Sequence, residues 1–91
     1  ARFLEMLTAE RGAAANTLAA YSRDLAQASR ALPTGLVAAD LAQLRAMLTG
    51  WSDLSASSVA RKISALRQFY AFLVDDGWRS DNPAVALARP T

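Results

Sequence analysis

The chain has 91 residues, a length that suits one domain and is too short for two independent hydrophobic cores. It contains neither cysteine nor histidine, which argues against a disulfide framework, a thiolate metal site and a self-contained hydrolase or zinc enzyme, so we expect no metal and no cofactor. The formal net charge of +2 is a mild bias toward anionic partners.

The first half of the chain predicts two helices. The first covers residues 2–11 and stops at Gly12, which can serve as a C-terminal cap. The second begins at Ala14 or Asn16 and ends at Leu32, just before a proline that cannot continue a helix. Four apolar residues at helical spacing share one face of this second helix: Leu18, Tyr21, Leu25 and Leu32.

The second half predicts two further helices of unequal length. A third helix extends over about residues 39–49 and is broken by Gly50. A fourth, longer helix begins at Ser55 or Ser57, because a serine hydroxyl can accept a hydrogen bond from an N–H group of the first turn. Gly77 ends this fourth helix.

The last segment, SDNPAVALARP, predicts a short fifth helix. Asn82 can cap it and Pro83 fits its first position, so we expect it to extend to about Ala88. No stretch shows the alternation of a β-strand, and no internal repeat is present. The sequence therefore predicts an all-α fold, a compact bundle of four to five helices joined by short loops.

The fourth helix has two faces of different composition. The apolar face, which predicts the core contact, consists of Val59, Ile63, Leu66, Tyr70 and Leu73. The opposite face consists of Ser57, Arg61, Ser64, Ala65 and Gln68, with Lys62 and Arg67 on its two shoulders. No acidic residue occurs between Leu54 and Val74. Small hydroxyl residues allow close approach to a polyanion and the cations attract it, so this face predicts DNA contact; an ordinary solvated face is the alternative.

The second helix carries a weaker version of the same surface. Its outward positions are Asn16, Ala20, Arg23 and Gln27. Asp24 tempers the positive charge there, and we expect it to pair with a neighbouring cation. Two helices that share a basic outer surface can clamp a duplex between them, which is a second reason to predict a DNA-binding domain.

Two stretches of the chain resemble a known family. They are ERGAAANTLAAYSRDL (residues 10–25) and SASSVARKISALRQFYAFLVDDGWRSDNPA (residues 55–84). Together they resemble the amino-terminal, SAM-like core-binding domain of the tyrosine site-specific recombinases, most closely the Xer type. The residues that carry this resemblance are, in order, Thr17, Tyr21, Asp24, Leu25, Arg61, Ser64, Ala65, Arg67, Phe69, Gly77, Asn82 and Pro83. The sequence departs from the family pattern at Ala14 and Ala15, where relatives often have a capping Ser or Thr.

The resemblance implies a SAM-like domain whose second and fourth helices contact the DNA of a recombination site. Carried over by position, the implied contact residues are Asn16, Thr17, Arg23, Ser57, Ser58, Arg61, Lys62 and Arg67. It further implies that residues 1–88 form this domain and that residues 89–91 begin a linker to a separate catalytic domain. The family's catalytic Tyr, Arg, Lys and His residues lie in that other domain. We therefore expect no enzymatic activity from this chain alone, and we expect Tyr21 and Tyr70 to be core residues.

The expected partners follow from the same resemblance. They are double-stranded DNA and other recombinase protomers, because recombinases of this type work as tetramers on two duplexes, whereas the isolated domain is expected to be monomeric. No apolar run approaches the roughly 18 residues that a membrane span needs, so we expect a cytoplasmic protein without membrane contact. Two alternatives stay open. One is a phage or transposon integrase of the same family. The other is a small SAM-like protein-interaction module, which would show an exposed apolar patch on the outer faces of the second and fourth helices.

Overall fold

The structure is a computed structural model, and it describes residue 3, residues 5–6 and residues 14–87. Its main elements are helices. The elements are α2 (Ala15–Ala31), α3 (Leu41–Leu48), the 3₁₀-helix η1 (Thr49–Trp51), α4 (Ala56–Asp75) and the 3₁₀-helix η2 (Pro83–Ala86). No strand occurs among the described residues, so the predicted all-α class is confirmed. Most of the first predicted helix and the expected start of a linker at residues 89–91 lie outside the described residues.

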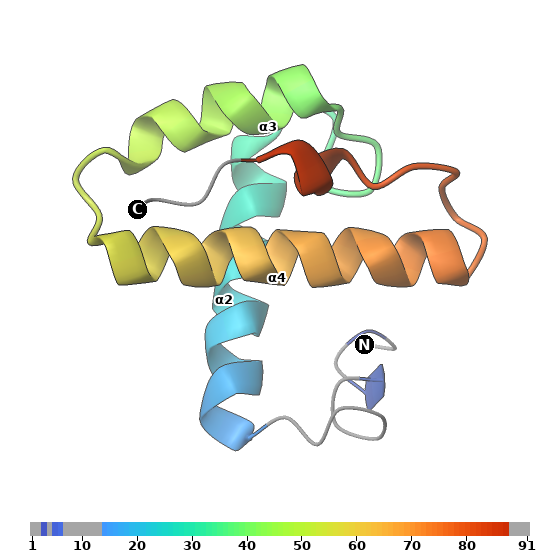
Figure 1. Cartoon of the computed structure of the whole chain (residues 1–91), viewed down its shortest axis with the longest axis horizontal. Coiled ribbons are helices and arrows are strands. Elements are labelled where there is room, and N and C mark those ends of the chain that lie inside the picture. Colours follow the sequence, from blue (N-terminus) through green and yellow to red (C-terminus); the bar gives the residue numbers. More distant parts are fainter. Residues whose placement is uncertain (1–2, 4, 7–13, 88–91) are drawn as a thin grey trace.

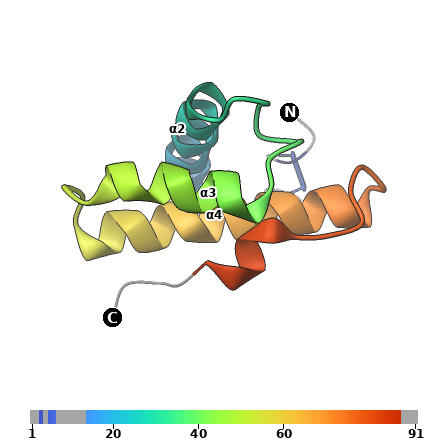
Figure 2. The same cartoon turned by 90° about the horizontal axis from the view of Figure 1, so that it is seen from above.

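The long helix α4 lies at the centre of the arrangement. Helices α3 and α4 lie side by side and run in opposite directions, and η1 leads from one toward the other (Figure 1). Helix α2 packs across α4 on one side, and η2 packs on α4 and α3 from the other side (Figure 2). Helix α4 is therefore covered on two opposite sides, and most of its side chains are buried or partly buried as a result.

The helix ends agree closely with the cap signals in the sequence. Ser55 is the N-cap of α4 and its hydroxyl accepts a hydrogen bond of 3.2 Å from the backbone N–H of Ser58. Gly77 follows the C-cap of α4 with φ of 82°, the left-handed conformation that only glycine adopts without strain. Ala14 precedes α2 without any side-chain cap, as its departure from the family pattern suggested.

The predicted fifth helix is present as the 3₁₀-helix η2. The side chain of Asn82 caps it by accepting a hydrogen bond of 3.0 Å from Ala84 N–H, and Pro83 holds its first position. The same Asn82 side chain donates a hydrogen bond of 3.0 Å to the carbonyl oxygen of Arg67 on α4. This second contact ties the end of the described chain to the central helix.

The predicted core stripe of α4 is confirmed. Ile63, Leu66, Tyr70 and Leu73 are buried, and Val59 packs against them at the edge. They meet buried apolar residues of α2, α3 and η2 and of the segments that follow α2 and η2: Ala28, Leu32, Leu36, Ala39, Leu44, Ala84 and Leu87. None of the described helices is long and apolar enough to cross a membrane.

The prediction for the opposite face of α4 is wrong in part. Ala65 is fully buried and Ser64 and Gln68 are partly buried, although all three were expected to face outward. The reason is that α2 packs on this face, and Ala65 lies in a small second cluster with Tyr21. An alanine and a serine on this face allow α2 to come close, so their small size serves helix packing.

Tyr70 makes the stability of the fold sensitive to alkaline pH. Its ring is fully buried and its hydroxyl donates a hydrogen bond of 2.6 Å to the carbonyl oxygen of Leu36. Burial raises the pKa of Tyr70 to about 12, from an ordinary value of 10.0. Because the folded-state pKa lies above the unfolded value, its contribution to stability is complete below pH 10.0 and is lost as pH rises toward about 12.

We therefore expect the free energy of unfolding to fall by about 1.4 kcal/mol per pH unit in this window because of Tyr70 alone. Urea unfolding at a series of pH values on both sides of 10.0 measures this slope. The Tyr70→Phe variant, which has no hydroxyl to ionise, should show a shallower decline. Parallel declines in the two proteins would mean that Tyr70 does not control the alkaline transition.

Candidate nucleic-acid interface

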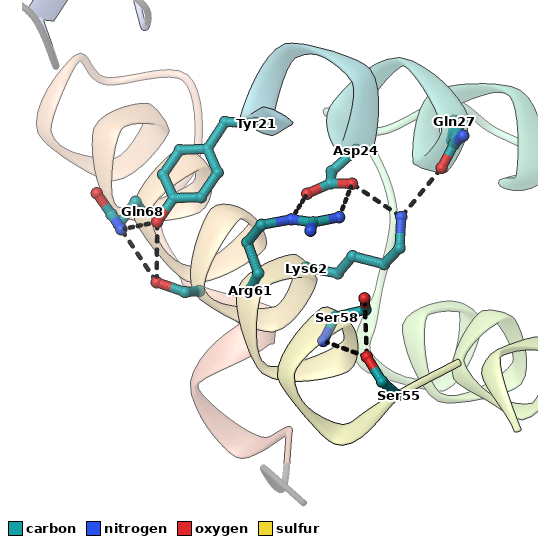
Figure 3. A network of polar contacts seen from close by, with 9 residues as sticks. Tyr21, Asp24, Gln27, Ser55, Ser58, Arg61, Lys62 and Gln68 are labelled. Carbon is teal, nitrogen blue, oxygen red and sulfur yellow. Dashed lines mark hydrogen bonds and ion pairs between the residues drawn. The ribbon is translucent and has the colours of Figure 1, made fainter. Parts of the chain in front are cut away.

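The crossing of α2 and α4 is organised by one buried carboxylate, that of Asp24. Asp24 is 7% exposed and accepts hydrogen bonds from two cations of α4 (Figure 3). Arg61 donates through Nε at 2.9 Å and through Nη2 at 3.1 Å, and Lys62 donates through Nζ at 2.8 Å. The expected pairing of Asp24 with a neighbouring cation is thus confirmed. Two positive groups surround one negative group, so the cluster has a net charge of +1.

Asp24 and Arg61 both stay ionised around neutral pH. Burial raises the pKa of Asp24, but the hydrogen bonds and the charges of Arg61 and Lys62 lower it by more. The pKa of Asp24 therefore lies below its ordinary value. The hydrogen bond with Asp24 raises the pKa of Arg61 above its already high ordinary value. The cluster therefore presents the same charges to a ligand throughout the neutral pH range.

Lys62 is buried, although the sequence placed it on the shoulder of an exposed face. Its side chain is 10% exposed. Besides Asp24, its ammonium group donates to Oε1 of Gln27 at 3.0 Å and lies 5.7 Å from the ring centre of Trp51. The prediction of exposure failed because α2 covers this side of α4. Lys62 holds the two helices together at their crossing.

A second polar cluster lies beside the first, toward the C-terminal end of α4. The hydroxyl groups of Tyr21 and Ser64 are 3.3 Å apart, and Gln68 donates through Nε2 to both, at 3.0 Å and 3.1 Å (Figure 3). Tyr21 is 9% exposed, which confirms its prediction as a core residue. This network fixes the position of α2 along α4 at a second point.

Arg67 makes contacts at the opposite side of α4. Its guanidinium group donates to three backbone carbonyl oxygens of the C-terminal segment: Ala84 at 3.2 Å, Val85 at 3.3 Å, and Leu87. The side chain is only partly exposed. These contacts give a charged donor to the carbonyl oxygens at the end of η2, and the oxygen of Ala84 accepts in addition from the backbone N–H of Leu87 at 3.1 Å. In the described structure, Arg67 anchors η2 to α4.

The remaining predicted residues are accessible to different degrees. Exposed residues are Asn16, Thr17, Arg23, Ser57 and Arg61, and Ser58 is partly buried. The hydroxyl of Ser55 donates a hydrogen bond of 3.0 Å to the hydroxyl of Ser58, and the hydroxyl of Ser57 lies 3.2 Å from that of Ser55. The structure therefore brings Ser57, Ser58 and Arg61 together on the first two turns of α4. Asn16 lies about 10 Å along α2 from Arg23, at 1.5 Å per residue.

Sequence reasoning missed one member of this surface, Arg30, and did not count another, Gln27, among the contact residues. Gln27 was seen as an outward residue and Arg30 was not considered, yet both are exposed and both follow Arg23 at the spacing of one helix face. The signal was available as the series Asn16, Arg23, Gln27, Arg30, with steps of seven, four and three residues. The role of Asp24 as the centre of the cluster was harder to find, because it depends on how α2 crosses α4.

Charge is distributed unevenly along α4. The first acidic residue of this helix is Asp75, at its last position, and Asp76 follows. On α2 the acidic residue is Asp24, which is buried beneath Arg61 and Lys62. The exposed surface of α2 and of the first half of α4 is therefore cationic and polar, and the acidic residues of α4 itself lie at its C-terminal end, whereas Asp53 is exposed in the loop that precedes this helix. No group of described residues is suited to hold a metal ion.

The described residues thus form a small helical domain with a cationic surface across α2 and α4. The chain matches the family described as the phage integrase, N-terminal SAM-like domain, over residues 1–77, and it belongs to this family. The resemblance to the Xer-type recombinases, drawn from the sequence motifs, is confirmed by individual relatives.

Three relatives show how similar the chain is to named proteins. It is 60% identical over 89 residues to the tyrosine recombinase XerC of Erythrobacter litoralis, covering 98% of this chain and 29% of the relative. It is 50% identical to the tyrosine recombinase XerD of Rhizobium meliloti and 43% identical to that of Caulobacter vibrioides, each over 93 residues, covering 97% of this chain and 30% of the relative. The chain thus spans about three-tenths of the length of these relatives. No solved structure matches it significantly.

Proposed function

We propose that this chain is the DNA-binding domain of a tyrosine recombinase and that it binds one half of a recombination site. Its family and its similarity to recombinases named XerC and XerD support the proposal. In the full-length protein, a catalytic domain outside this chain would cleave the DNA, and four protomers would act on two duplexes. The recombination would be of the kind that resolves chromosome dimers; integration of mobile DNA is the alternative within the family.

The observation that carries the proposal is the surface of α2 and of the first half of α4. It displays Arg23, Arg30 and Arg61, and no exposed acidic residue occurs on α2 or on α4 before Asp75. Arginine donates several hydrogen bonds in a planar fork that matches phosphate oxygens. The hydroxyl of Ser57 lies near the N-terminus of α4, where the helix dipole also favours a phosphate. We assign the contacts to Asn16, Thr17, Arg23, Ser57, Ser58 and Arg61.

Lys62 and Arg67 receive a different role in this proposal. Both were expected to contact DNA, but their donor groups are engaged by Asp24 and Gln27 in one case and by carbonyl oxygens of the C-terminal segment in the other. We propose that they support the interface by fixing α2 and η2 on α4. Their substitution would then act on DNA affinity through the fold.

A gel-shift titration of the 91-residue chain with a mixed-sequence duplex across a salt series tests the proposal. Arg61→Ala should weaken binding about tenfold and lower the slope of log affinity against log salt by about 0.9, the value of one phosphate contact. Arg45→Ala removes the same charge from the exposed end of α3 and is the matched control. It should leave the affinity nearly unchanged. Equal losses in both variants would show only a general charge effect.

The second candidate function is a SAM-like protein-interaction module. The large apolar residues that are exposed among the described ones are Val37, Leu54, Trp78 and Val85, and none of them lies on α2 or α4. An open apolar hollow of about 380 Å³ exists near the C-terminal end of α4, lined in part by Phe3, Phe72 and Trp78. It lies at the acidic end of α4, away from the surface proposed for DNA. Failure of the chain to bind duplex DNA at low salt would favour this second function.

A further inference from the structure

We infer that Asp24 is a positioning residue for DNA binding, which holds Arg61 so that one edge of its guanidinium group stays directed toward a phosphate. This inference rests on the proposed function. Asp24 itself does not reach the ligand, because its side chain is 5% exposed beneath the 41% exposed side chain of Arg61. The ligand in this inference is a phosphate group of duplex DNA, and the guanidinium group of Arg61 binds it.

The hydrogen-bond geometry divides the guanidinium group into two edges. Nε and one N–H of Nη2 donate to the two oxygens of Asp24. A guanidinium group has five N–H bonds, so three remain, on Nη1 and Nη2. Within the described part of the chain no acceptor contacts Nη1 of Arg61, and Figure 3 shows it without a dashed contact. Two adjacent nitrogens with free N–H bonds can bind two oxygens of one phosphate.

Lys62 completes the arrangement from the other side. Its ammonium group donates to Oδ1 of Asp24, the oxygen that also accepts from Nη2 of Arg61. It therefore compensates the negative charge that would otherwise repel a phosphate, and the cluster keeps a net charge of +1. It also fixes the carboxylate, so that Arg61 is held against a rigid group on α2. An arginine that is already ordered loses less rotamer freedom when it binds a phosphate, so the contact is formed at a lower cost in conformational entropy.

A simpler role for Asp24 makes the opposite prediction. If Asp24 only reduced the positive charge of the surface, its replacement by asparagine would raise DNA affinity, because the net charge would increase by one. If Asp24 positions Arg61, the same replacement weakens binding and removes most of what Arg61 contributes. The sign of the change thus separates the two roles.

The experiment is a double-mutant cycle in the Lys62→Met background, which has no buried ammonium group that would be left unpaired by the loss of Asp24. In this background, binding of a mixed-sequence duplex is measured at low salt for the parent, Asp24→Asn, Arg61→Ala and the combination. Arg61→Ala should weaken binding about tenfold when Asp24 is present and about twofold when it is replaced. Circular dichroism of each variant verifies that the helices are retained.

Arg23→Ala provides the matched control in both backgrounds. Arg23 is exposed, and the side chain of Asp24 pairs with Arg61 and Lys62, so the contribution of Arg23 to affinity should be the same with and without Asp24→Asn. A general loosening of the domain would reduce the effects of Arg23→Ala and Arg61→Ala alike and would overturn the inference. Tighter binding by Asp24→Asn, or an unchanged effect of Arg61→Ala, would overturn it as well. Absence of binding by the unmodified chain would instead remove the proposed function, together with every inference drawn from it.

Discussion

Replacing Asp24 by alanine should lower the free energy of unfolding by about 3 kcal/mol, whereas replacing Lys62 by methionine should change it by less than about 1 kcal/mol. The two residues form one ion pair, but replacing one of them does not cost the same free energy of unfolding as replacing the other. Without Asp24, the ammonium group of Lys62 stays buried with only the Gln27 side chain as acceptor. Without Lys62, Asp24 keeps both hydrogen bonds from Arg61, and methionine fills the volume of the lysine stem beside Trp51.

Urea unfolding followed by circular dichroism measures both changes. Asp53→Ala is a suitable control for the loss of an acidic group, because Asp53 is exposed in the loop before α4. It should have little effect on stability. Equal losses for Asp24→Ala and Lys62→Met would contradict the arrangement, since they would mean that the pair contributes as an ordinary surface salt bridge.

The stabilisation by Asp24 should also depend on pH. Its pKa in the folded protein lies below the ordinary value of 3.8, so its contribution is complete above pH 3.8 and is lost as pH falls through the lower folded-state value. The difference in stability between the unmodified chain and Asp24→Asn should therefore shrink in acid. Unfolding curves measured above and below pH 3.8 test this, and a constant difference would show that the carboxylate is not the source of the stabilisation.

Arg67→Ala should lower the free energy of unfolding by about 2 kcal/mol, because three backbone carbonyl oxygens lose a charged donor. Arg67→Lys should restore little of this loss. An ammonium group is a point charge and does not reproduce the fork that reaches Ala84, Val85 and Leu87 together. The effect should be local, so that η2 detaches from α4 before the other helices unfold.

Hydrogen exchange at the end of η2 tests this localisation. The amide of Leu87 donates to Ala84 at 3.1 Å, and its exchange should accelerate more in Arg67→Ala than that of amides within α2. Arg45→Ala removes an exposed arginine from α3 and should leave both rates unchanged. Uniform acceleration throughout the domain would contradict the assignment of Arg67 to the anchoring of η2.

Local chemistry made the ends of the helices predictable. Ser55, Gly77 and Asn82 each act through contacts within a few residues, so their roles follow from the sequence alone. The apolar stripe of α4 was predictable for a similar reason, since helical periodicity fixes which side chains share a face. The fifth helix was correctly placed but forms a 3₁₀-helix, which short segments often prefer.

The candidate interface was only half predictable, because periodicity does not reveal how many neighbours a helix has. A helix with one apolar face is normally exposed on the other, yet α4 is covered by α2 there, which buries Ala65 and Lys62. Both residues are compatible with exposure and with close packing: alanine is small, and lysine can bury its stem when a carboxylate meets its end. Arg61 and Arg23 were predicted as exposed, and they are: Arg61 lies at the edge of the crossing, where its side chain reaches Asp24 and is still 41% exposed.

The most direct test of the proposed interface is a map of the amides that DNA perturbs. The isotope-labelled chain is titrated with a mixed-sequence duplex, and the NMR shift of every backbone amide is followed at low salt. The proposed interface predicts that the largest shifts cluster on the exposed stripe of α2, around Asn16 and Arg23, and on the first two turns of α4, from Ser57 to Arg61. Shifts that cluster around Trp78 near the acidic end of α4, or no shifts at all, would contradict it.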